Sequence, residues 1–351
     1  MTRTPPLNWA LALSVLAISA CNESTTPNQP GTAGDRTPLV PSSAPSEAGF
    51  EASAGQHLWA VVNRNGYLVR GSRVTGVAHL GLGRYEITFA RNVTKCAYLA
   101  TTIKSHRQAN VIFPASGHRS VNGVYVEIRD QTSGMTDGPF NLVVVCNELG
   151  NRFAVIGYSA NLVRATPGTI VNHQGSGGYH VTFTRSVRPC SYIATVADPG
   201  NGSVVLPAVV ATARSTGDNS VFVQTFSLAG GDQEGFPFHL ALICSSTQAS
   251  RYAVVRHDGI LHRSSAGTTS ARISSGRYTI TSDRDLTACA AVATRGSITG
   301  RFPSPPATVE IIPGLTANSV GFLLRRLLVD VPRGYSGGGY TNQEFHAALF
   351  C

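Results

Sequence analysis

One sequence pattern occurs three times in this chain of 351 residues, in the same register and without a gap. Each copy starts with an aromatic residue followed by Ala-Val, at Trp59, Phe153 and Tyr252. Further identical residues then recur at matching positions: Arg70, Arg164 and Arg263; Gly83, Gly177 and Gly276; Arg91, Arg185 and Arg284; and Cys96, Cys190 and Cys289. Each copy closes with a Phe that stands six residues before a second cysteine, at Cys146, Cys244 and Cys351. This self-similarity predicts three copies of one structural unit.

The local pattern within each copy is typical of β-strands. Apolar and polar residues alternate over Tyr85–Phe89 and Tyr179–Phe183, which is the period of a strand with one buried face. The runs 140–145 and 238–243 are almost continuously apolar, as in strands buried on both faces. Seven or eight short strands in about 90 residues predict an all-β fold of three tandem antiparallel β-sandwich or barrel-like modules.

The repeat and the composition predict the domain boundaries. We expect modules at 57–147, 148–247 and 248–351. The third is the longest and most divergent, with Ser282 and Ala291 where the other copies have Phe and Tyr, so we expect its core to be the least well filled. Residues 21–56 are rich in Pro, Ser, Thr, Ala and Gly, which predicts a disordered linker.

The N-terminus predicts export. Residues 1–20 contain a basic start, a short apolar run and small residues, which are the features of a secretory signal peptide. Ile18-Ser19-Ala20-Cys21 resembles the bacterial lipobox, and this resemblance implies that Cys21 is lipidated and becomes the mature N-terminus. The alternative is an ordinary secreted protein with a chance cysteine near its cleavage site. The expected location is the cell surface, anchored by lipid, and the outer membrane if the cell is Gram-negative.

The other six cysteines recur as pairs, which in an exported protein predicts a disulfide framework. Six cysteines allow 15 connectivities, and the repeat favours Cys96–Cys146, Cys190–Cys244 and Cys289–Cys351. With Cys21 lipidated, the mature protein is then predicted to contain no free thiol. Metal binding is the rival interpretation, but the sequence has no CxxC and no His at ligand spacing, so we expect neither a metal nor a cofactor.

The recurring arginines allow two interpretations. Their guanidinium groups are candidates for contacts with a ligand's phosphate or carboxylate. The alternative is structural, with the guanidinium bound to backbone carbonyls or stacked on a strand aromatic. We favour the structural alternative because the copies diverge at their other polar positions. The candidate residues are Arg70, Arg164 and Arg263, and Arg91, Arg185 and Arg284.

No catalytic residue is predicted. His239 and His346 follow the closing Phe, but the first copy has Asn141 there, so we expect partly exposed strand histidines rather than a catalytic or metal-binding set. Residues 334–338 match the G-x-S-x-G pattern but lie in a Gly-rich stretch, whereas that motif needs a strand before it and a helix after it. The copies also share no recurrent Asp or Glu.

The full pattern, from [W/F/Y]-A-V-V through G-x-Y-x-[V/I]-T-F and C-x-Y-x-A-T to F-x-L-x-x-x-C, resembles a tandem β-repeat of uncharacterised secreted proteins and lipoproteins in actinobacteria and related bacteria. The stretches Gly83–Phe89 and Gly178–Phe183 are also similar to strand motifs in the head modules of phage tail fibres. Neither resemblance implies a catalytic residue.

The net charge of the chain indicates the class of partner. The formal net charge of +9 suits an acidic glycan or an anionic envelope polymer. No recognised nucleic-acid module is present, so we expect no nucleic-acid partner. The sequence therefore predicts a non-enzymatic binding or adhesion protein for an envelope polymer, glycan or surface protein, held on the membrane by its lipid. A structural spacer of the cell envelope and a secreted hydrolase with a site outside known motifs are the alternatives, and no oligomeric state is predicted.

Overall fold

The structure is a computed structural model that describes residues 57–105, 109–147, 151–175, 177–200, 208–228, 235–244, 250–300, 307–327 and 339–351. All of these residues belong to one compact unit. The described residues form β-strands and no helices, as the sequence predicts. None of these residues forms a helix that could span a membrane. The predicted signal peptide, Cys21, the linker at 21–56 and the Gly-rich stretch at 334–338 lie outside the described residues.

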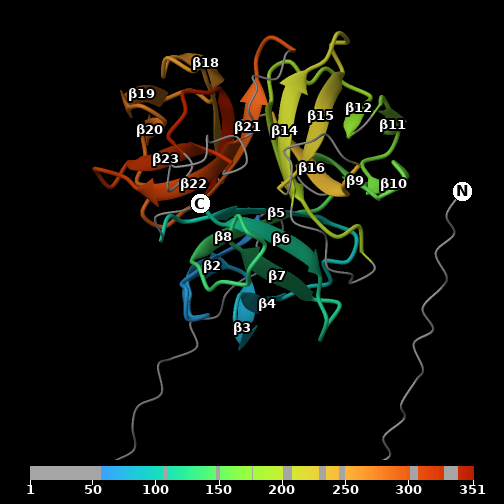
Figure 1. Ribbon diagram of the computed structural model, residues 1–351, viewed down its shortest axis with the longest axis vertical. Helices are drawn as coiled ribbons and strands as arrows, with labels where there is room; N and C mark the ends of the chain where they lie inside the picture. Colours follow the sequence, from blue (N-terminus) through green and yellow to red (C-terminus); the bar gives the residue numbers. More distant parts are fainter. Residues whose placement is uncertain are drawn as a thin grey trace, which may run out of the picture. The chain divides into compact units, whose positions relative to one another are not determined.

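The first eight strands, here called the first set, form two four-stranded antiparallel sheets with the orders β2-β1-β8-β5 and β3-β4-β7-β6 (Figure 1). The strands are β1 (Leu58–Val62), β2 (Leu68–Ser72), β3 (Val74–Gly81), β4 (Arg84–Phe89), β5 (Ala97–Thr102), β6 (Val111–Ser116), β7 (Gly123–Arg129) and β8 (Phe140–Val145).

The second set repeats these strand orders, as β10-β9-β16-β13 and β11-β12-β15-β14. Its strands are β9 (Arg152–Ile156), β10 (Leu162–Ala165), β11 (Ile170–His173), β12 (Gly178–Thr182), β13 (Ser191–Val196), β14 (Ala208–Arg214), β15 (Ser220–Ser227) and β16 (Phe238–Ile243).

The third set has the same orders again, as β18-β17-β24-β21 and β19-β20-β23-β22. Its strands are β17 (Ser250–Val255), β18 (Leu261–Ser264), β19 (Thr268–Ser274), β20 (Arg277–Ser282), β21 (Ala290–Ser297), β22 (Ala307–Pro313), β23 (Ser319–Arg326) and β24 (Phe345–Phe350). A parallel pairing of β14 with β21 joins one sheet of the second set to one of the third, giving an eight-stranded sheet.

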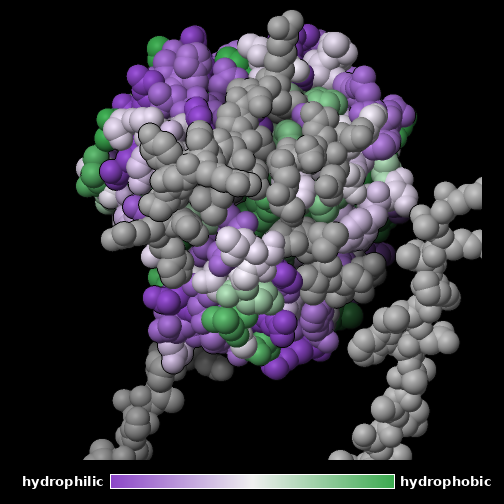
Figure 2. All heavy atoms as spheres, viewed as in Figure 1, coloured by the Kyte–Doolittle hydropathy of each residue, from purple (hydrophilic) through white to green (hydrophobic). Residues whose placement is uncertain are grey.

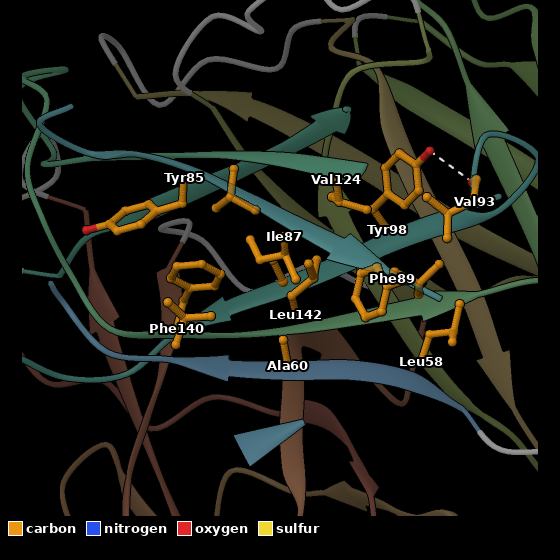
Figure 3. Packing of buried hydrophobic residues seen from close by; sticks show 14 of the residues in the cluster. Leu58, Ala60, Tyr85, Ile87, Phe89, Val93, Tyr98, Val124, Phe140 and Leu142 are labelled. Atoms are coloured by element: carbon orange, nitrogen blue, oxygen red, sulfur yellow. Dashed lines mark hydrogen bonds between the residues drawn. The ribbon is translucent and has the colours of Figure 1, made fainter. Parts of the chain in front are cut away.

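Each set has its own apolar core between its two sheets. In the first set, Tyr85, Ile87 and Phe89 point inward from β4 toward Leu142 and Phe140 of β8 (Figure 3). Before this inward-facing strand the chain turns tightly at Gly83, whose φ is +69° and where a Cβ would lie 2.6 Å from the Ile128 carbonyl oxygen. Only glycine adopts such a turn without strain, which explains why the equivalent positions are also glycine.

A further core joins the three sets and explains the continuously apolar closing strands. On β8, Phe140, Leu142 and Val144 face the core of the first set, whereas Val143 and Val145 face this shared core. The shared core also contains Trp59 of β1, the second set's Phe153 and Ile243, and the third set's Tyr252, Val292 and Phe350. A strand that separates two cores buries both of its faces, so it loses the polar alternation of a half-exposed strand.

Three disulfides close the sets: Cys96–Cys146, Cys190–Cys244 and Cys289–Cys351. These are the pairs that the repeat favours. Each joins the residue at or just before the fifth strand of its set to the residue that follows the last strand, across sequence separations of 50, 54 and 62 residues. In the chain-entropy model a closed loop of this length stabilises the folded state by about 4 kcal/mol.

Candidate binding site

The three sets contact one another through a closed ring of threonine hydrogen bonds. The Oγ1 atoms of Thr195, Thr294 and Thr101 accept from the backbone N–H groups of Ala100, Ala194 and Ala293, at 3.1, 2.8 and 2.9 Å respectively. The second set therefore binds the first, the third binds the second, and the first binds the third. This order means that the recurring Ala-Thr pair of the sequence joins one set to the next.

The first recurring arginine follows the same cyclic order. The Nε atoms of Arg164, Arg263 and Arg70 donate to the carbonyl oxygens of Cys96, Cys190 and Cys289, at 2.8, 2.7 and 2.9 Å. Each guanidinium thus reaches across an interface to a disulfide-bonded cysteine of the neighbouring set. These bonds to backbone carbonyls are the contacts expected if the arginines have a structural role.

At the interface between the first and second sets, Arg164 also stacks on an aromatic ring. Its guanidinium lies 5.5 Å from the centre of the Tyr98 ring. The Tyr98 side chain fills the core of its own set, and its hydroxyl donates to the Val93 carbonyl oxygen at 3.0 Å (Figure 3). On the other side, His239 Nδ1 accepts from the Tyr98 backbone N–H at 2.8 Å. A tyrosine, an arginine and a histidine together close this interface.

The interface between the second and third sets repeats these contacts. Arg263 lies 4.9 Å from the centre of the Tyr192 ring, and His346 Nδ1 accepts from the Tyr192 backbone N–H at 2.8 Å. His239 and His346 are fully buried, so the expectation of partly exposed strand histidines is wrong. Their burial follows from the shared interface, which the strand pattern of a single copy does not reveal.

The interface between the third and first sets differs at two of these positions. Ala291 stands where Tyr98 and Tyr192 stand, and Asn141 stands in place of the histidine. Arg70 keeps its bond to Cys289 but has no tyrosine ring at the equivalent position to stack on. The Asn141 side chain is 2% exposed, and its Oδ1 has no hydrogen-bond partner among the described residues.

A pocket of about 650 Å³ lies at this third interface. Its walls come from β1, β2 and β8 of the first set and from β21 to β24 of the third. Arg70, Asn141 and Ala291 line it together with a mainly apolar set of residues: Val61, Val69, Leu286, Ile311, Leu315, Val320 and Leu349. Loss of the tyrosine ring explains part of this space, since Val320 is partly exposed whereas its equivalents Val124 and Val221 are fully buried.

Exposed apolar residues belong to the pocket lining. Leu315 is 82% exposed and Val69 is 55% exposed. Figure 2 shows a face of the molecule on which hydrophilic residues predominate and hydrophobic ones gather in small patches. Apolar side chains exposed beside a concave apolar surface are typical of ligand sites.

Electrostatics distinguish the closed interfaces from the open one. Burial lowers the pKa values of His239 and His346 well below the ordinary histidine value, and the nearby Arg164 and Arg263 guanidinium groups lower them further. Both imidazoles are therefore neutral at pH 7. His239 Nε2 consequently carries the proton and donates to the Asp198 carbonyl oxygen at 2.7 Å. The pKa of Arg70 is also lowered by burial, but Arg70 remains a cation at any physiological pH.

The second recurring arginine does not lie at this pocket. Arg91 is half-buried, and Arg185 and Arg284 are exposed, at the turns that follow β4, β12 and β20. None of the three belongs to the pocket lining. Of the six candidate arginines, only Arg70 lines the pocket.

A second hollow contains a serine and a histidine in contact. Ser215 Oγ lies 2.9 Å from His180 Nδ1, and Gln174 Oε1 lies 2.5 Å from His180 Nε2, at the edge of a hollow of about 500 Å³. Serine hydrolases place a carboxylate behind the histidine to stabilise the imidazolium that forms. The neutral Gln174 amide does not supply that charge, so this group does not reproduce a hydrolase triad.

No protein-family model, curated protein or solved structure matches this chain. The described residues also contain no group of three His, Cys, Asp or Glu side chains placed to hold a metal ion. The pocket between the third and first sets is therefore the candidate binding site. Its residues Asn141 and Ala291 were visible in the sequence as the positions where one copy departs from the other two, which is the signal that could have located it.

Proposed function

We propose that this chain is a non-enzymatic binding protein of the cell surface, which recognises an envelope component through the pocket between its third and first sets. The pocket is the observation that carries the proposal. Its volume of about 650 Å³ lies within the range of about 300 to 1,000 Å³ that is usual for small-molecule sites. A mainly apolar lining with a few polar groups is also usual for such sites.

The proposal includes three β-sandwich modules, one for each set, at residues 57–147, 148–247 and 248–351. The repeated strand order and the one disulfide in each set support this division. The first and second modules, and the second and third modules, contact each other through a tyrosine, an arginine and a histidine. The interface between the third and first modules binds the ligand. The chain is exported, which the six disulfide-bonded cysteines support because disulfides persist outside the cytoplasm. The anchor is a lipid on Cys21, which the resemblance of Ile18-Ser19-Ala20-Cys21 to a lipobox supports.

Retention on native cell envelope tests the binding function. The full chain carrying Cys21→Ser, which leaves every described residue unchanged, is expected to be retained. Arg70→Met is expected to reduce retention at least fivefold. Arg164→Met is the matched control, because it removes the same carbonyl bond at a closed interface and leaves the pocket lining intact. Equal loss for the two variants, or no retention of the parent, contradicts the proposal; the second result is the one expected of a spacer.

Metabolic labelling with palmitate tests the anchor separately. The wild-type chain is expected to incorporate the label, and Cys21→Ser is expected to incorporate none. Thiol titration of the denatured, unreduced wild-type protein is expected to find no free cysteine. A label that survives Cys21→Ser, or one free thiol per chain, contradicts the anchor without affecting the pocket.

A further inference from the structure

The two closed interfaces show what the open one lacks. In the first set the Tyr98 ring lies between the core of its own set and the Arg164 guanidinium. The space that this ring fills is here called the seat. The hydroxyl at the far end of that ring donates to the Val93 carbonyl oxygen. Tyr192 has the same position beside Arg263. The same seat in the third set, at Ala291, has no ring of its own.

The polar groups that surround the ring in the first set have equivalents in the third. Leu286 stands where Val93 stands, and its carbonyl oxygen accepts from Cys289 N–H as that of Val93 accepts from Cys96 N–H, both at 3.0 Å. A carbonyl oxygen has two lone pairs, so that of Leu286 can accept a second bond, as the Val93 oxygen does from Tyr98. Arg70 presents its guanidinium where Arg164 stacks on Tyr98.

The opposite end of the seat offers an acceptor. At the closed interfaces, His239 and His346 reach the backbone N–H of the tyrosine at this end. Asn141 has the shorter side chain, and its buried Oδ1 has no partner among the described residues. A buried acceptor without a partner costs about 1 to 3 kcal/mol. A ligand that donates a hydrogen bond here recovers that cost, which favours a donor at the end of the ligand near Asn141.

We propose that this pocket binds a small molecule with a para-hydroxylated aromatic ring, which takes the place of the tyrosine ring absent at Ala291. The phenol hydroxyl donates to the Leu286 carbonyl oxygen, the ring stacks on Arg70, and a second donor across the ring meets Asn141. The proposal rests on the proposed binding function and names the chemistry of its ligand. The pocket is larger than one ring, so the natural ligand carries further apolar atoms toward Leu315 and Val69.

Two probes measure the parts of this site by titration calorimetry or NMR on the full chain with Cys21→Ser. p-Cresol is the tyrosine side chain alone, and 4-hydroxybenzyl alcohol adds a donor at the other end of the ring. We expect both to bind saturably, the alcohol about fivefold more tightly, as one net hydrogen bond gives. Toluene, which lacks the phenol hydroxyl, is expected to bind more weakly than p-cresol.

Substitutions test whether the probes bind in the pocket beside Ala291. Ala291→Tyr puts the ring back and is expected to weaken p-cresol binding at least tenfold. Asn141→Leu is expected to abolish the advantage of the alcohol over p-cresol, and it keeps the proposal testable if Ala291→Tyr does not fold. Tyr192→Ala is the matched control, because it opens the same seat at a closed interface and is expected to add a second p-cresol site.

The outcomes separate the ligand chemistry from the binding function. Absence of p-cresol binding, or equal binding by wild type and Ala291→Tyr, overturns the proposed ligand class. An alcohol advantage that persists in Asn141→Leu overturns the role of Asn141. If the chain is retained on envelope but binds no p-cresol, the function stands and the ligand chemistry fails; if it neither binds p-cresol nor is retained, both fail.

Discussion

The interface between the second and third sets and the interface between the third and first sets are built from the same positions of one repeat, yet one is closed and the other holds a pocket. Both have the threonine bond and the bond from arginine to a cysteine carbonyl. They differ where Tyr192 and His346 are replaced by Ala291 and Asn141. The threonine and arginine contacts therefore join the sets at both interfaces, and the tyrosine and histidine positions decide whether an interface is filled or open.

Opening a closed interface is expected to have the largest effect. Tyr192→Ala removes a buried aromatic side chain and leaves a cavity beside Arg263, which in protein cores costs about 3 to 5 kcal/mol. Urea unfolding measures the change. Tyr67→Ala, at a tyrosine that is 69% exposed, is the control and should cost less than about 0.5 kcal/mol. Similar losses for the two variants would show that Tyr192 does not close the interface.

Acid is expected to weaken the closed interfaces. The pKa values of His239 and His346 are lowered in the folded state, so the unfolded chain binds more protons below its histidine pKa of about 6.5. Stability therefore falls as pH falls below about 6.5. Each histidine contributes a slope of about 1.4 kcal/mol per pH unit until its folded pKa is reached.

A single substitution separates the pH dependence due to a histidine from the opposite contribution of a buried carboxyl group. Burial raises the pKa of Glu310 to about 7, so Glu310 changes stability in the opposite direction as pH falls from 7. His346→Asn makes a closed interface resemble the open one and leaves Glu310 unchanged. Its free energy of unfolding, measured from pH 7 to pH 5, should fall less than that of wild type by about 2 kcal/mol over this range. An unchanged slope would mean that His346 does not carry this dependence.

The reverse substitution at the open interface is expected to have the smallest effect. Asn141→His supplies the residue found at the other two interfaces, and its Nδ1 can accept the Ala291 backbone N–H as His346 accepts that of Tyr192. One net hydrogen bond stabilises a protein by about 1 kcal/mol, which urea unfolding at pH 8 can resolve. Val69→His, at another residue of the pocket lining that is 55% exposed, is the control. A loss of stability in Asn141→His alone would show that the two kinds of interface are not equivalent.

The sequence predicts the content of each set but not how the sets meet. Strand alternation at Tyr85–Phe89 and the paired cysteines suffice for the β-fold and its disulfides, because both depend on one copy at a time. The shared core, the arginine bonds and the buried histidines depend on contacts between residues about 70 to 220 positions apart, such as Arg70 with Cys289. No local period encodes such contacts. The continuously apolar strands 140–145 and 238–243 were the one local sign that a second core lies behind each set.

The stability of Ala291→Tyr tests the central claim that the pocket is the seat of a missing tyrosine. If the seat is intact, the new ring is buried as Tyr98 and Tyr192 are, and the free energy of unfolding rises by about 1.5 to 3 kcal/mol. Ala293→Tyr is the control, because Ala293 lies two residues away on β21, is buried, and does not line the pocket; there the ring should overpack the core and destabilise it by about 1 to 3 kcal/mol. Destabilisation by Ala291→Tyr equal to that by Ala293→Tyr would contradict the account.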